Sequence, residues 1–409
     1  MKCRHCSAEL ATSFLDLGTS PPSNAYLRRD QLAAPETWFP LRIMACASCW
    51  LVQTEDYASR EILFSNDYAY FSSFSSSWLA QCRDYAATMV HRYGLTGASL
   101  VCEVAANDGY LLQYFKSSGI PCYGVEPTAS TAAAARAKGI EIVEEFFGVA
   151  LATRLRDQGR SADLMAANNV VAHVPDVGDF LKGFAILLKP SGVATFEFPH
   201  LLRMVEHAQF DTAYHEHYSY WSLTAAVRVF AANGLTIFDA DELPSHGGSL
   251  RVHAQRSDTG TRSPSDTLHA VLAAEHRAGV ETPAFYAGFQ TRAEGIKDAF
   301  VAFLIEAKKT GLKVGAYGAA AKGNTLLNFA GIKSDLLPWV VDANPVKQGM
   351  FLPGSRIPIV AEERLRAEKP DRIVLLPWNL KDELMQKLAY AREWNAKFVI
   401  AVPSLLILD

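Results

Sequence analysis

Apolar and polar positions alternate through the middle of the chain in a way that predicts a sheet of parallel strands. We expect strands at the short apolar runs 100–104, 122–125, 164–167 and 193–198. Helical patterns lie between them at residues 110–118, 129–138 and 177–188. Strands that alternate with helices favour an α/β domain in which helices cover both faces of a mostly parallel sheet.

The segments on either side of this region differ in character. Residues 1–60 contain little periodic structure, and a polar aromatic stretch at 66–77 and a helical pattern at 78–93 follow them. A long helical pattern at 264–311 leads into a second strand–glycine–helix unit at 313–324. Further apolar runs at 339–341 and 372–376 are typical of parallel strands. We therefore expect three domains, at residues 1–75, 76–260 and 261–409.

Composition and charge narrow the choice of partners. The 409 residues are 49% hydrophobic and carry a net charge of −4, which is ordinary for a globular chain. A weakly acidic chain without a dense Lys/Arg run argues against nucleic acid as a partner. No apolar stretch approaches the ~20 residues that cross a bilayer, and the N-terminus lacks the apolar region of a signal peptide. We expect a cytoplasmic protein that acts on a small molecule.

Four of the seven cysteines form two Cys-x-x-Cys pairs, Cys3 with Cys6 and Cys46 with Cys49. Each pair can aim two thiolates at one point, and two pairs supply the tetrahedral sulfur ligands of structural zinc. A redox dithiol and unrelated cysteines are the alternatives. Four thiolates leave no open coordination position, so we expect this Zn²⁺ to be structural.

The first strand of the central region ends in an acidic turn with one glycine. A pyrophosphate would favour a glycine-rich loop, whereas this turn suits a cationic ligand such as the methyl donor S-adenosylmethionine. A plain tight turn is the alternative. The turn contributes the candidate donor-binding residues Glu103, Ala105, Asn107, Asp108 and Gly109.

Further donor-binding candidates follow the next strands. Glu126, with Pro127 after it, ends a strand about 20 residues further on, where an acidic side chain commonly binds ribose hydroxyls. Phe146 and Phe147 either flank the adenine ring or form a buried aromatic pair. Asn168, at the end of the third strand, faces the same edge of the sheet.

Several motifs in a fixed order resemble the sugar C-methyltransferases of deoxysugar biosynthesis. They comprise both cysteine pairs, 67–73, Glu103 to Gly109, 124–127, 169–175, Tyr214-His-Glu-His217, 246–248, 317–322, 347–355 and 378–379. The resemblance implies an N-terminal zinc-binding domain, a central class I (Rossmann-like) methyltransferase domain and a C-terminal Rossmann-like domain. It also implies a nucleotide-sugar substrate that lies between the domains.

The family's catalytic residues map onto this sequence by their motifs. The base, the last histidine of a Tyr-x-Glu-His segment, maps to His217, with Glu216 and Tyr214 beside it. The remaining catalytic candidates are Tyr68 or Tyr70, Asn169 and His173. The sequence departs from the pattern at His215, and an extra residue before Asn169 leaves its register with Asn168 open.

Candidate substrate contacts lie in the turn at 246–248 and in the C-terminal region. They are His246, Gly247, Lys322, Asn324, Asn328, Lys347 and Gln348. A plain turn is the alternative for the first two, and a solvated loop is the alternative for the last two. The turn at 315–321 lacks the third glycine of a dinucleotide fingerprint, which argues against a working NAD site.

The resemblance, together with these patterns, implies methyl transfer from S-adenosylmethionine to a ring carbon, C3 first, of a nucleotide-linked 4-keto-6-deoxysugar. A base removes the proton beside the ketone, and the enolate attacks the methyl group. O- or N-methylation of a sugar nucleotide is the alternative. A nucleic-acid-binding zinc module and an NAD-dependent oxidoreductase are more distant interpretations. We expect a monomer or a weak homodimer.

Overall fold

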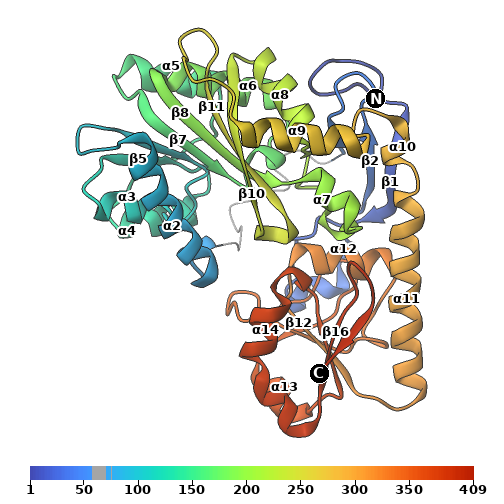
Figure 1. The fold of residues 1–409 in the computed structure, drawn as a ribbon. Coiled ribbons are helices and arrows are strands. Elements are labelled where there is room, and N and C mark those ends of the chain that lie inside the picture. Colours follow the sequence, from blue (N-terminus) through green and yellow to red (C-terminus); the bar gives the residue numbers. More distant parts are fainter. Residues whose placement is uncertain (58–70, 75) are drawn as a thin grey trace.

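The computed structural model describes residues 1–57, 71–74 and 76–409, which contain the three sheets seen in Figure 1. The first sheet is antiparallel, with the order β1-β2-β3-β9. Its strands are β1 (Thr12–Ser20), β2 (Phe39–Ala45), β3 (Val52–Thr54) and β9 (Ser219–Tyr220). Because β9 pairs with β3, the chain directly after residue 217 is part of the N-terminal sheet.

The central sheet has seven strands in the order β10-β11-β8-β7-β4-β5-β6. They are β4 (Val101–Val104), β5 (Cys122–Val125), β6 (Glu141–Val143), β7 (Ala162–Asn168), β8 (Leu188–Pro199), β10 (Leu235–Leu243) and β11 (Ser249–Arg256). The four predicted parallel strands are confirmed as β4, β5, β7 and β8. Strand β8 begins at Leu188, five residues before the predicted start, because this segment pairs with β7 from Ala162 onward.

Helices cover both faces of the central sheet, as the alternating pattern predicted. One face carries α2 (Ser76–Tyr93), α3 (Leu112–Ser117) and α4 (Ala129–Ala137). The other carries α5 (Val149–Asp157), α6 (Val177–Leu187), α8 (Leu223–Ala232) and α9 (Asp266–Ala278). A separate cluster of buried apolar side chains fills each interface. Short α7 (Leu201–Glu206) follows β8.

The helical region predicted at 264–311 contains three helices. After α9 come α10 (Pro283–Tyr286) and α11 (Phe289–Lys309). Gly279 is the C-cap of α9 and Gly288 is the N-cap of α11, and both adopt left-handed backbone, with φ of 81° and 78°. Helix α11 runs from below α10 down the right-hand side of Figure 1, along the C-terminal body.

The C-terminal sheet has the order β14-β13-β12-β15-β16-β17, parallel except for β17. Its strands are β12 (Val314–Tyr317), β13 (Val340–Val341), β14 (Ile359–Val360), β15 (Arg372–Leu375), β16 (Lys397–Ile400) and β17 (Leu406–Leu408). Its helices are α12 (Ala321–Phe329), α13 (Glu363–Glu368) and α14 (Lys381–Lys387). Helix α12 lies at the top of this body, beneath the central one (Figure 1).

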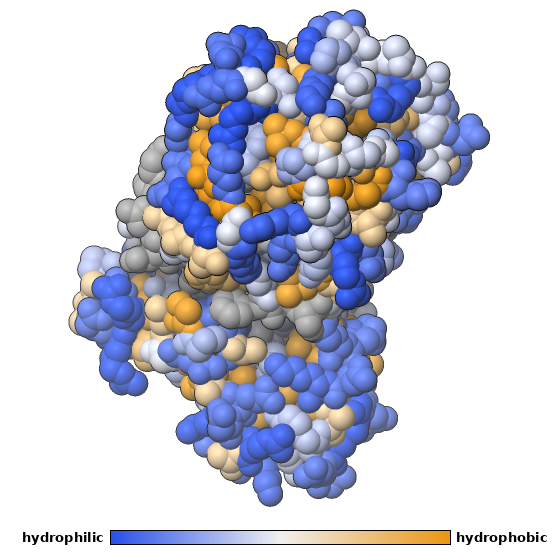
Figure 2. All heavy atoms as spheres, turned by 90° about the vertical axis from the view of Figure 1, so that its left-hand side faces the viewer, coloured by the Kyte–Doolittle hydropathy of each residue, from blue (hydrophilic) through white to orange (hydrophobic). Residues whose placement is uncertain are grey.

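The N-terminal sheet joins the C-terminal body through α11. The Phe14 ring of β1 stacks on Phe289 with centroids 4.5 Å apart, and both belong to one core cluster that continues into the C-terminal sheet. The face in Figure 2 is largely hydrophilic, with apolar residues gathered on the upper body. Among the helices of the described residues, none is long and apolar enough to cross a membrane.

Candidate active site

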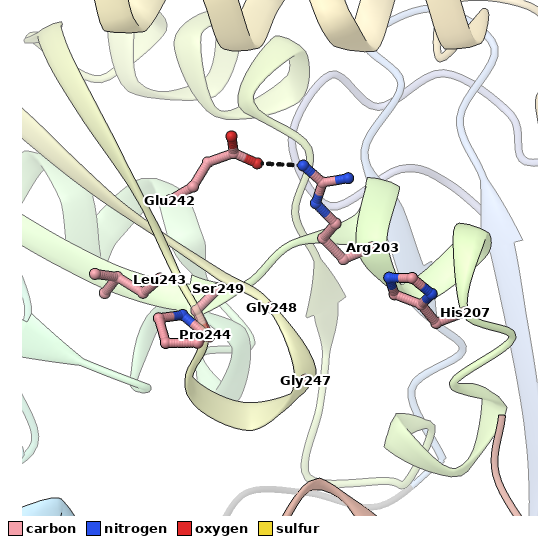
Figure 3. A pocket seen from close by; sticks show the side chains of 8 residues that line it. All are labelled: Arg203, His207, Glu242, Leu243, Pro244, Gly247, Gly248 and Ser249. Carbon is pink, nitrogen blue, oxygen red and sulfur yellow. Dashed lines mark hydrogen bonds and ion pairs between the residues drawn. The ribbon is translucent and has the colours of Figure 1, made fainter.

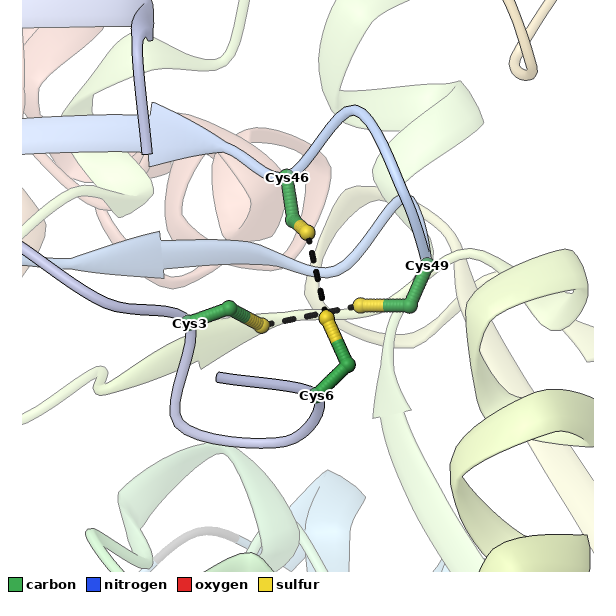
Figure 4. A group of neighbouring side chains, drawn as sticks. All are labelled: Cys3, Cys6, Cys46 and Cys49. Atoms are coloured by element: carbon green, nitrogen blue, oxygen red, sulfur yellow. Dashed lines mark hydrogen bonds between the residues drawn. The ribbon is translucent and has the colours of Figure 1, made fainter. Parts of the chain in front are cut away.

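The four predicted zinc ligands converge at one end of the N-terminal sheet (Figure 4). Cys3 Sγ lies 3.6 Å from Cys49 Sγ, and Cys6 Sγ lies 3.5 Å from Cys46 Sγ. All four sulfur atoms lie within 4.8 Å of one another. These separations fit four thiolates around one tetrahedral Zn²⁺. Gln53 Nε2 donates to Cys3 Sγ at 3.2 Å, which would orient that ligand.

A group of buried carboxylates surrounds the turn after β4. Glu103 is fully buried, and neither of its oxygens accepts a hydrogen bond of good geometry. Burial raises the pKa of Glu103 well above its ordinary value, and the negative charges of Glu126 and Asp108 add to the effect. Asp108 lies 3.4 Å from Lys138 Nζ through Oδ2, while its Oδ1 is buried and has no partner among the described residues. Unsatisfied buried carboxyl oxygens fit a ligand that brings positive charge and N–H donors.

The backbone of this turn is unusual for its residue types. Ala105 and Asn107 have φ of 57° and 47°, in the left-handed region that non-glycine residues rarely adopt. Such residues concentrate at ligand sites. Gly109 has φ of 76°, and a Cβ there would lie 2.4 Å from Ile140 Cδ1. The turn is therefore held in a conformation that its sequence alone does not favour.

Glu126, just after β5, forms hydrogen bonds that link the end of this strand to the turn after β4. Its Oε2 accepts the Asn107 backbone N–H at 2.9 Å, and its Oε1 accepts that of Thr128 at 2.9 Å. Burial raises the pKa of Glu126, and these two N–H donors oppose the shift. Pro127 follows directly on the strand. The carboxylate thus stands at the position expected for a ribose contact.

The other donor-site candidates differ in environment. Phe147 is partly buried and packs against Phe180 and Phe184 with ring centroids 5.7 and 5.1 Å away. Phe146 is 43% exposed, so the two rings do not form a buried pair. Asn168 is buried at the end of β7, with its side-chain oxygen unpartnered among the described residues.

His217 is held in one tautomer by the backbone. Its Nδ1 lies 2.8 Å from the Thr212 carbonyl oxygen, so Nδ1 carries the proton and Nε2 presents a lone pair. The Tyr214 hydroxyl donates to Nε2 at 2.7 Å. The pKa of His217 is lowered well below its ordinary value by burial first and then by His173. His217 is therefore a neutral base with its lone pair fixed in direction.

His173 repeats the same arrangement beside it. It ends the short helix η3 (Val171–His173) after β7, and its ring centroid lies 4.7 Å from that of His217. Its Nδ1 donates to the Glu216 carbonyl oxygen at 2.8 Å, and burial lowers its pKa to about 4. Because β7 pairs with β4, both imidazoles stand at the edge of the sheet where the acidic turn lies.

Glu216 and His215 point away from this imidazole pair. Both carboxylate oxygens of Glu216 accept hydrogen bonds from Asn24 Nδ2, at 2.9 and 2.7 Å. Burial raises the pKa of Glu216 to about 7, and Asn24 opposes the shift. His215 Nε2 donates to the Pro40 carbonyl oxygen at 3.1 Å. No motif in the sequence pointed to Asn24, which lies in a loop of the N-terminal domain.

The turn between β10 and β11 brings a third histidine to the site. His246 lies in η5 (Ser245–Gly247) with φ of 56°, and its Nε2 lies 3.3 Å from Asn169 Nδ2. Lys322 Nζ of α12 donates to the His246 carbonyl oxygen at 3.1 Å. Gly247 has φ of 90°, and a Cβ there would lie 2.5 Å from the Trp378 ring. Here the C-terminal body contacts the central one.

The remaining substrate candidates lie on the C-terminal side. Asn324 is fully buried, and both polar atoms of its side chain lack a partner among the described residues. Asn328 donates to the Asn324 carbonyl oxygen at 3.1 Å. Lys347 Nζ donates to the Ala319 carbonyl oxygen at 2.9 Å, and Gln348 donates to that of Asp342 at 2.9 Å. Tyr68 and Tyr70 lie outside the described residues.

The structure also shows site residues that the sequence did not single out. Asp211, in η4 (Phe210–Thr212), is fully buried and accepts the Trp378 indole N–H at 2.7 Å. Burial raises the pKa of Asp211 to about 6, against the effect of Lys322. Figure 3 shows an open pocket of about 450 Å³ at the turn between β10 and β11. Arg203, Glu242 and Gly247 are among the residues that line it. The side chains of Arg203 and Glu242 pair with each other there, at 2.7 Å.

Comparisons with known proteins identify the family. Three family models match in chain order: "Putative zinc binding domain" at residues 3–64, "Methyltransferase domain" at 79–240 and "C-methyltransferase C-terminal domain" at 244–403. A Streptomyces niveus protein, "C-methyltransferase NovU", is 30% identical over 402 residues, covering 98% of this chain and 95% of the relative. The chain belongs to the C-methyltransferase family. This C-methyltransferase depends on S-adenosylmethionine and has a zinc site built from four cysteines.

Solved structures resemble the C-methyltransferase over less than half of its length. Magnesium protoporphyrin IX methyltransferase from Synechocystis PCC 6803 is 17% identical and covers 44% of this chain and 79% of its own, with a TM-score of 0.34. A methyltransferase from Clostridium acetobutylicum is 11% identical and covers 44% and 92%, with a TM-score of 0.36.

Proposed function

We propose that this C-methyltransferase transfers the methyl group to C3 of a nucleotide-linked 4-keto-6-deoxysugar through an enolate. The observation that carries the proposal is the pair of neutral imidazoles, His217 and His173, with backbone-fixed tautomers at the edge of the central sheet. A carbon next to a ketone gives up its proton only to a positioned base. A neutral histidine meets that need near neutral pH.

In this proposal His217 is the general base. His217 Nε2 takes the C3 proton, the C–H electron pair becomes the C3–C4 double bond, and the carbonyl π pair moves to O4. The Thr212 carbonyl oxygen accepts a hydrogen bond from Nδ1 and keeps that nitrogen protonated. The protein therefore still binds the ring at Nδ1 after Nε2 has taken the proton. Tyr214, which donates to Nε2 in the ligand-free protein, shares or yields that position to the substrate.

The acidic turn after β4 is the proposed donor site. S-adenosylmethionine supplies a methyl group on sulfonium, whose C–S electron pair leaves on sulfur as the new C–C bond forms. Glu103 and Asp108 hold the positive charge of the donor, and Glu126 contacts the ribose while it keeps Asn107 in place. The remaining donor contacts of the proposal are Ala105, Gly109, Pro127, Phe146 and Asn168, while Phe147 contributes through packing.

The substrate lies between the central and C-terminal bodies in this proposal. Its contacts are Asn169, His246, Gly247, Lys322, Asn324, Asn328, Lys347 and Gln348, together with Tyr68 or Tyr70. Glu216, protonated or ionised near neutral pH, holds a sugar hydroxyl with Asn24. The domain division at 1–75, 76–260 and 261–409 stays part of the same proposal.

Isotope exchange tests the proposal without the methyl donor. The chain is incubated in D₂O with a panel of dTDP- and GDP-linked 4-keto-6-deoxysugars, and loss of the C3 proton signal is followed by NMR. We expect exchange with one panel member and a mass gain of one methyl group after donor is added. His217→Gln should slow exchange by about 10²–10⁴-fold, the range of general-base catalysis.

A matched control and a contrary outcome complete the test. His276→Gln changes a histidine whose side chain is 81% exposed on α9, and it should leave exchange unchanged. Methylation of a hydroxyl or amino group without exchange of the ring proton would overturn the proposal in favour of O- or N-methylation.

A further inference from the structure

Asp211 is a fully buried carboxylate at the contact between the central and C-terminal bodies. One oxygen accepts the Trp378 indole N–H at 2.7 Å, and the other is buried without a partner among the described residues. An isolated charge in such a place is costly, so a buried carboxylate needs a cation nearby. The sequence and the family resemblance assign Asp211 no role.

Lys322 supplies that cation. Its Nζ lies 5.0 Å from the centroid of the Trp378 ring, and its charge and that of Asp211 each favour the ionised form of the other. An ammonium can donate three hydrogen bonds. Within the described residues Nζ donates to the His246 carbonyl oxygen alone, so two N–H groups remain for a substrate oxygen.

The positive charge of Lys322 affects the proposed base, His217. This charge is one of the causes that lower the pKa of His217 and of His246. The connection is also covalent, because Thr212, whose carbonyl fixes the His217 tautomer, follows Asp211 in η4. The ammonium and the imidazole lone pair therefore belong to one site.

The two imidazoles cannot themselves hold a developing negative charge at O4. His173 and His217 each use their single N–H to bind a backbone carbonyl oxygen, so the Nε2 atom of each neutral ring is an acceptor. Asn169 directs an amide nitrogen to His246 Nε2. A donor with positive charge must come from another element, and α12 of the C-terminal body presents Lys322.

We propose that Lys322 is the cation that stabilises the enolate oxygen, with Asp211 and Trp378 as positioning residues that hold its ammonium in place. This inference rests on the enolate chemistry proposed above. As the ring proton passes to His217 and the carbonyl π pair moves to O4, Lys322 keeps its own proton and donates hydrogen bonds to O4. No other group changes its protonation in this step.

The negative charge of Asp211, which acts on the Lys322 ammonium, favours this role over binding of the substrate's diphosphate. It reduces the net positive charge of this region, which is poor for a dianion that is charged from the start. A charge that grows only in the transition state gains from a fixed, desolvated ammonium.

The test separates the rate of enolate formation from substrate affinity. Ring-proton exchange in D₂O, without donor, is measured on the dTDP- or GDP-linked 4-keto-6-deoxysugar that the wild-type protein exchanges. Lys322→Met should lower kcat for exchange by about 10²–10³-fold, the loss typical of one oxyanion donor. We expect KM to change less than fivefold, and Lys322→Arg to restore part of kcat.

Variants of the positioning residues give an independent measurement. Asp211→Asn keeps an acceptor for the Trp378 N–H but removes the charge, and we expect about a tenfold loss in kcat with an unchanged melting temperature. Trp378→Phe keeps a ring beside the ammonium and should cost less than Asp211→Asn. Lys309→Met, at an exposed site on α11, is the control and should match the wild-type protein.

The outcomes distinguish the two proposals. If Lys322→Met raises KM and leaves kcat near the wild-type value, the ammonium binds substrate and the inference is wrong. If His217→Gln abolishes exchange while Lys322→Met and Asp211→Asn do not slow it, the inference fails but the proposed function stands. If the wild-type protein shows no exchange with any panel member, the proposed function itself fails. If Lys322→Met does not fold, Lys322→Arg and Asp211→Asn decide the question through kcat.

Discussion

Replacing Glu103 with glutamine should weaken binding of the methyl donor without destabilising the ligand-free protein. These effects separate because the Glu103 carboxyl is fully buried, yet neither oxygen accepts a hydrogen bond of good geometry. The substitution removes no such interaction from the ligand-free fold. It removes one charge-assisted interaction from the complex, worth about 1.5–3 kcal/mol. At about 1.4 kcal/mol per tenfold, Kd for S-adenosylmethionine should rise about 10- to 150-fold.

The pH dependence has a definite sign. The pKa of Glu103 is raised in the ligand-free fold because burial and the nearby carboxylates disfavour its charged form. The donor cation binds the ionised form, so donor affinity should increase as pH rises through that raised pKa. The stability that this carboxyl contributes is present below its unfolded pKa and is lost as pH rises through the folded one. Glu103→Gln should abolish both effects.

Calorimetry in two buffers of different ionisation enthalpy measures Kd and proton release on binding together. The melting temperature measures the stability of the ligand-free variant. Glu141→Gln is the control, because the Glu141 side chain is 65% exposed and pairs with Arg160 at the surface. A melting temperature several degrees below wild type, or an unchanged Kd, would refute the reasoning.

Three other predictions concern the base, the metal and the C-terminal turn. The acid limb of the pH–rate profile for ring-proton exchange should lie below pH 6.5, the ordinary histidine pKa, because burial and His173 lower that of His217; a limb at or above 6.5 contradicts this. Cys6→Ser should reduce bound zinc, measured by colorimetric titration, and lower the melting temperature; full zinc content contradicts a four-thiolate site. Gly318→Ala should cost about 1–3 kcal/mol of stability, because its Cβ would lie 2.3 Å from Pro377 at a φ of 92°. Gly331→Ala, at positive φ with open space around it, should lower the melting temperature less, and equal losses would contradict the clash.

The sequence revealed the buried parallel strands but not the β10–β11 hairpin. Parallel strands covered on both faces are continuous apolar runs and need no alternation to be recognised. In β11 the polar side chains are themselves buried: Arg251 pairs with Glu197 at 2.6 Å, and His253 with Asp241 at 2.8 Å. A register shift in β10 after Ile237 interrupts its alternation further. Hydrophobicity alone therefore predicted no strand on either side of the His246 turn.

The site could be predicted where its residues lie close together in the chain. The cysteine pairs, the acidic turn and the Tyr214–His217 segment are local motifs, and the structure holds each of them together. Asp211 and Trp378 touch across 167 positions, and no spacing in the sequence relates them. The tautomer of His217 depends on a backbone carbonyl, which carries no sequence signal.

The segment that carries the proposed base is held by two domains other than its own. From the zinc-binding side, Thr54 Oγ1 donates to the His217 carbonyl oxygen at 2.6 Å, and Asn24 donates to Glu216. From the C-terminal side, Thr325 of α12 donates to the backbone just before Tyr214, at 2.9 Å. A base that must point one lone pair at one carbon loses rate with small displacements. The cysteines Cys46 and Cys49 lie between β2 and β3, the strand that contains Thr54. We therefore expect the zinc site to influence catalysis through the position of His217 without taking part in the chemistry.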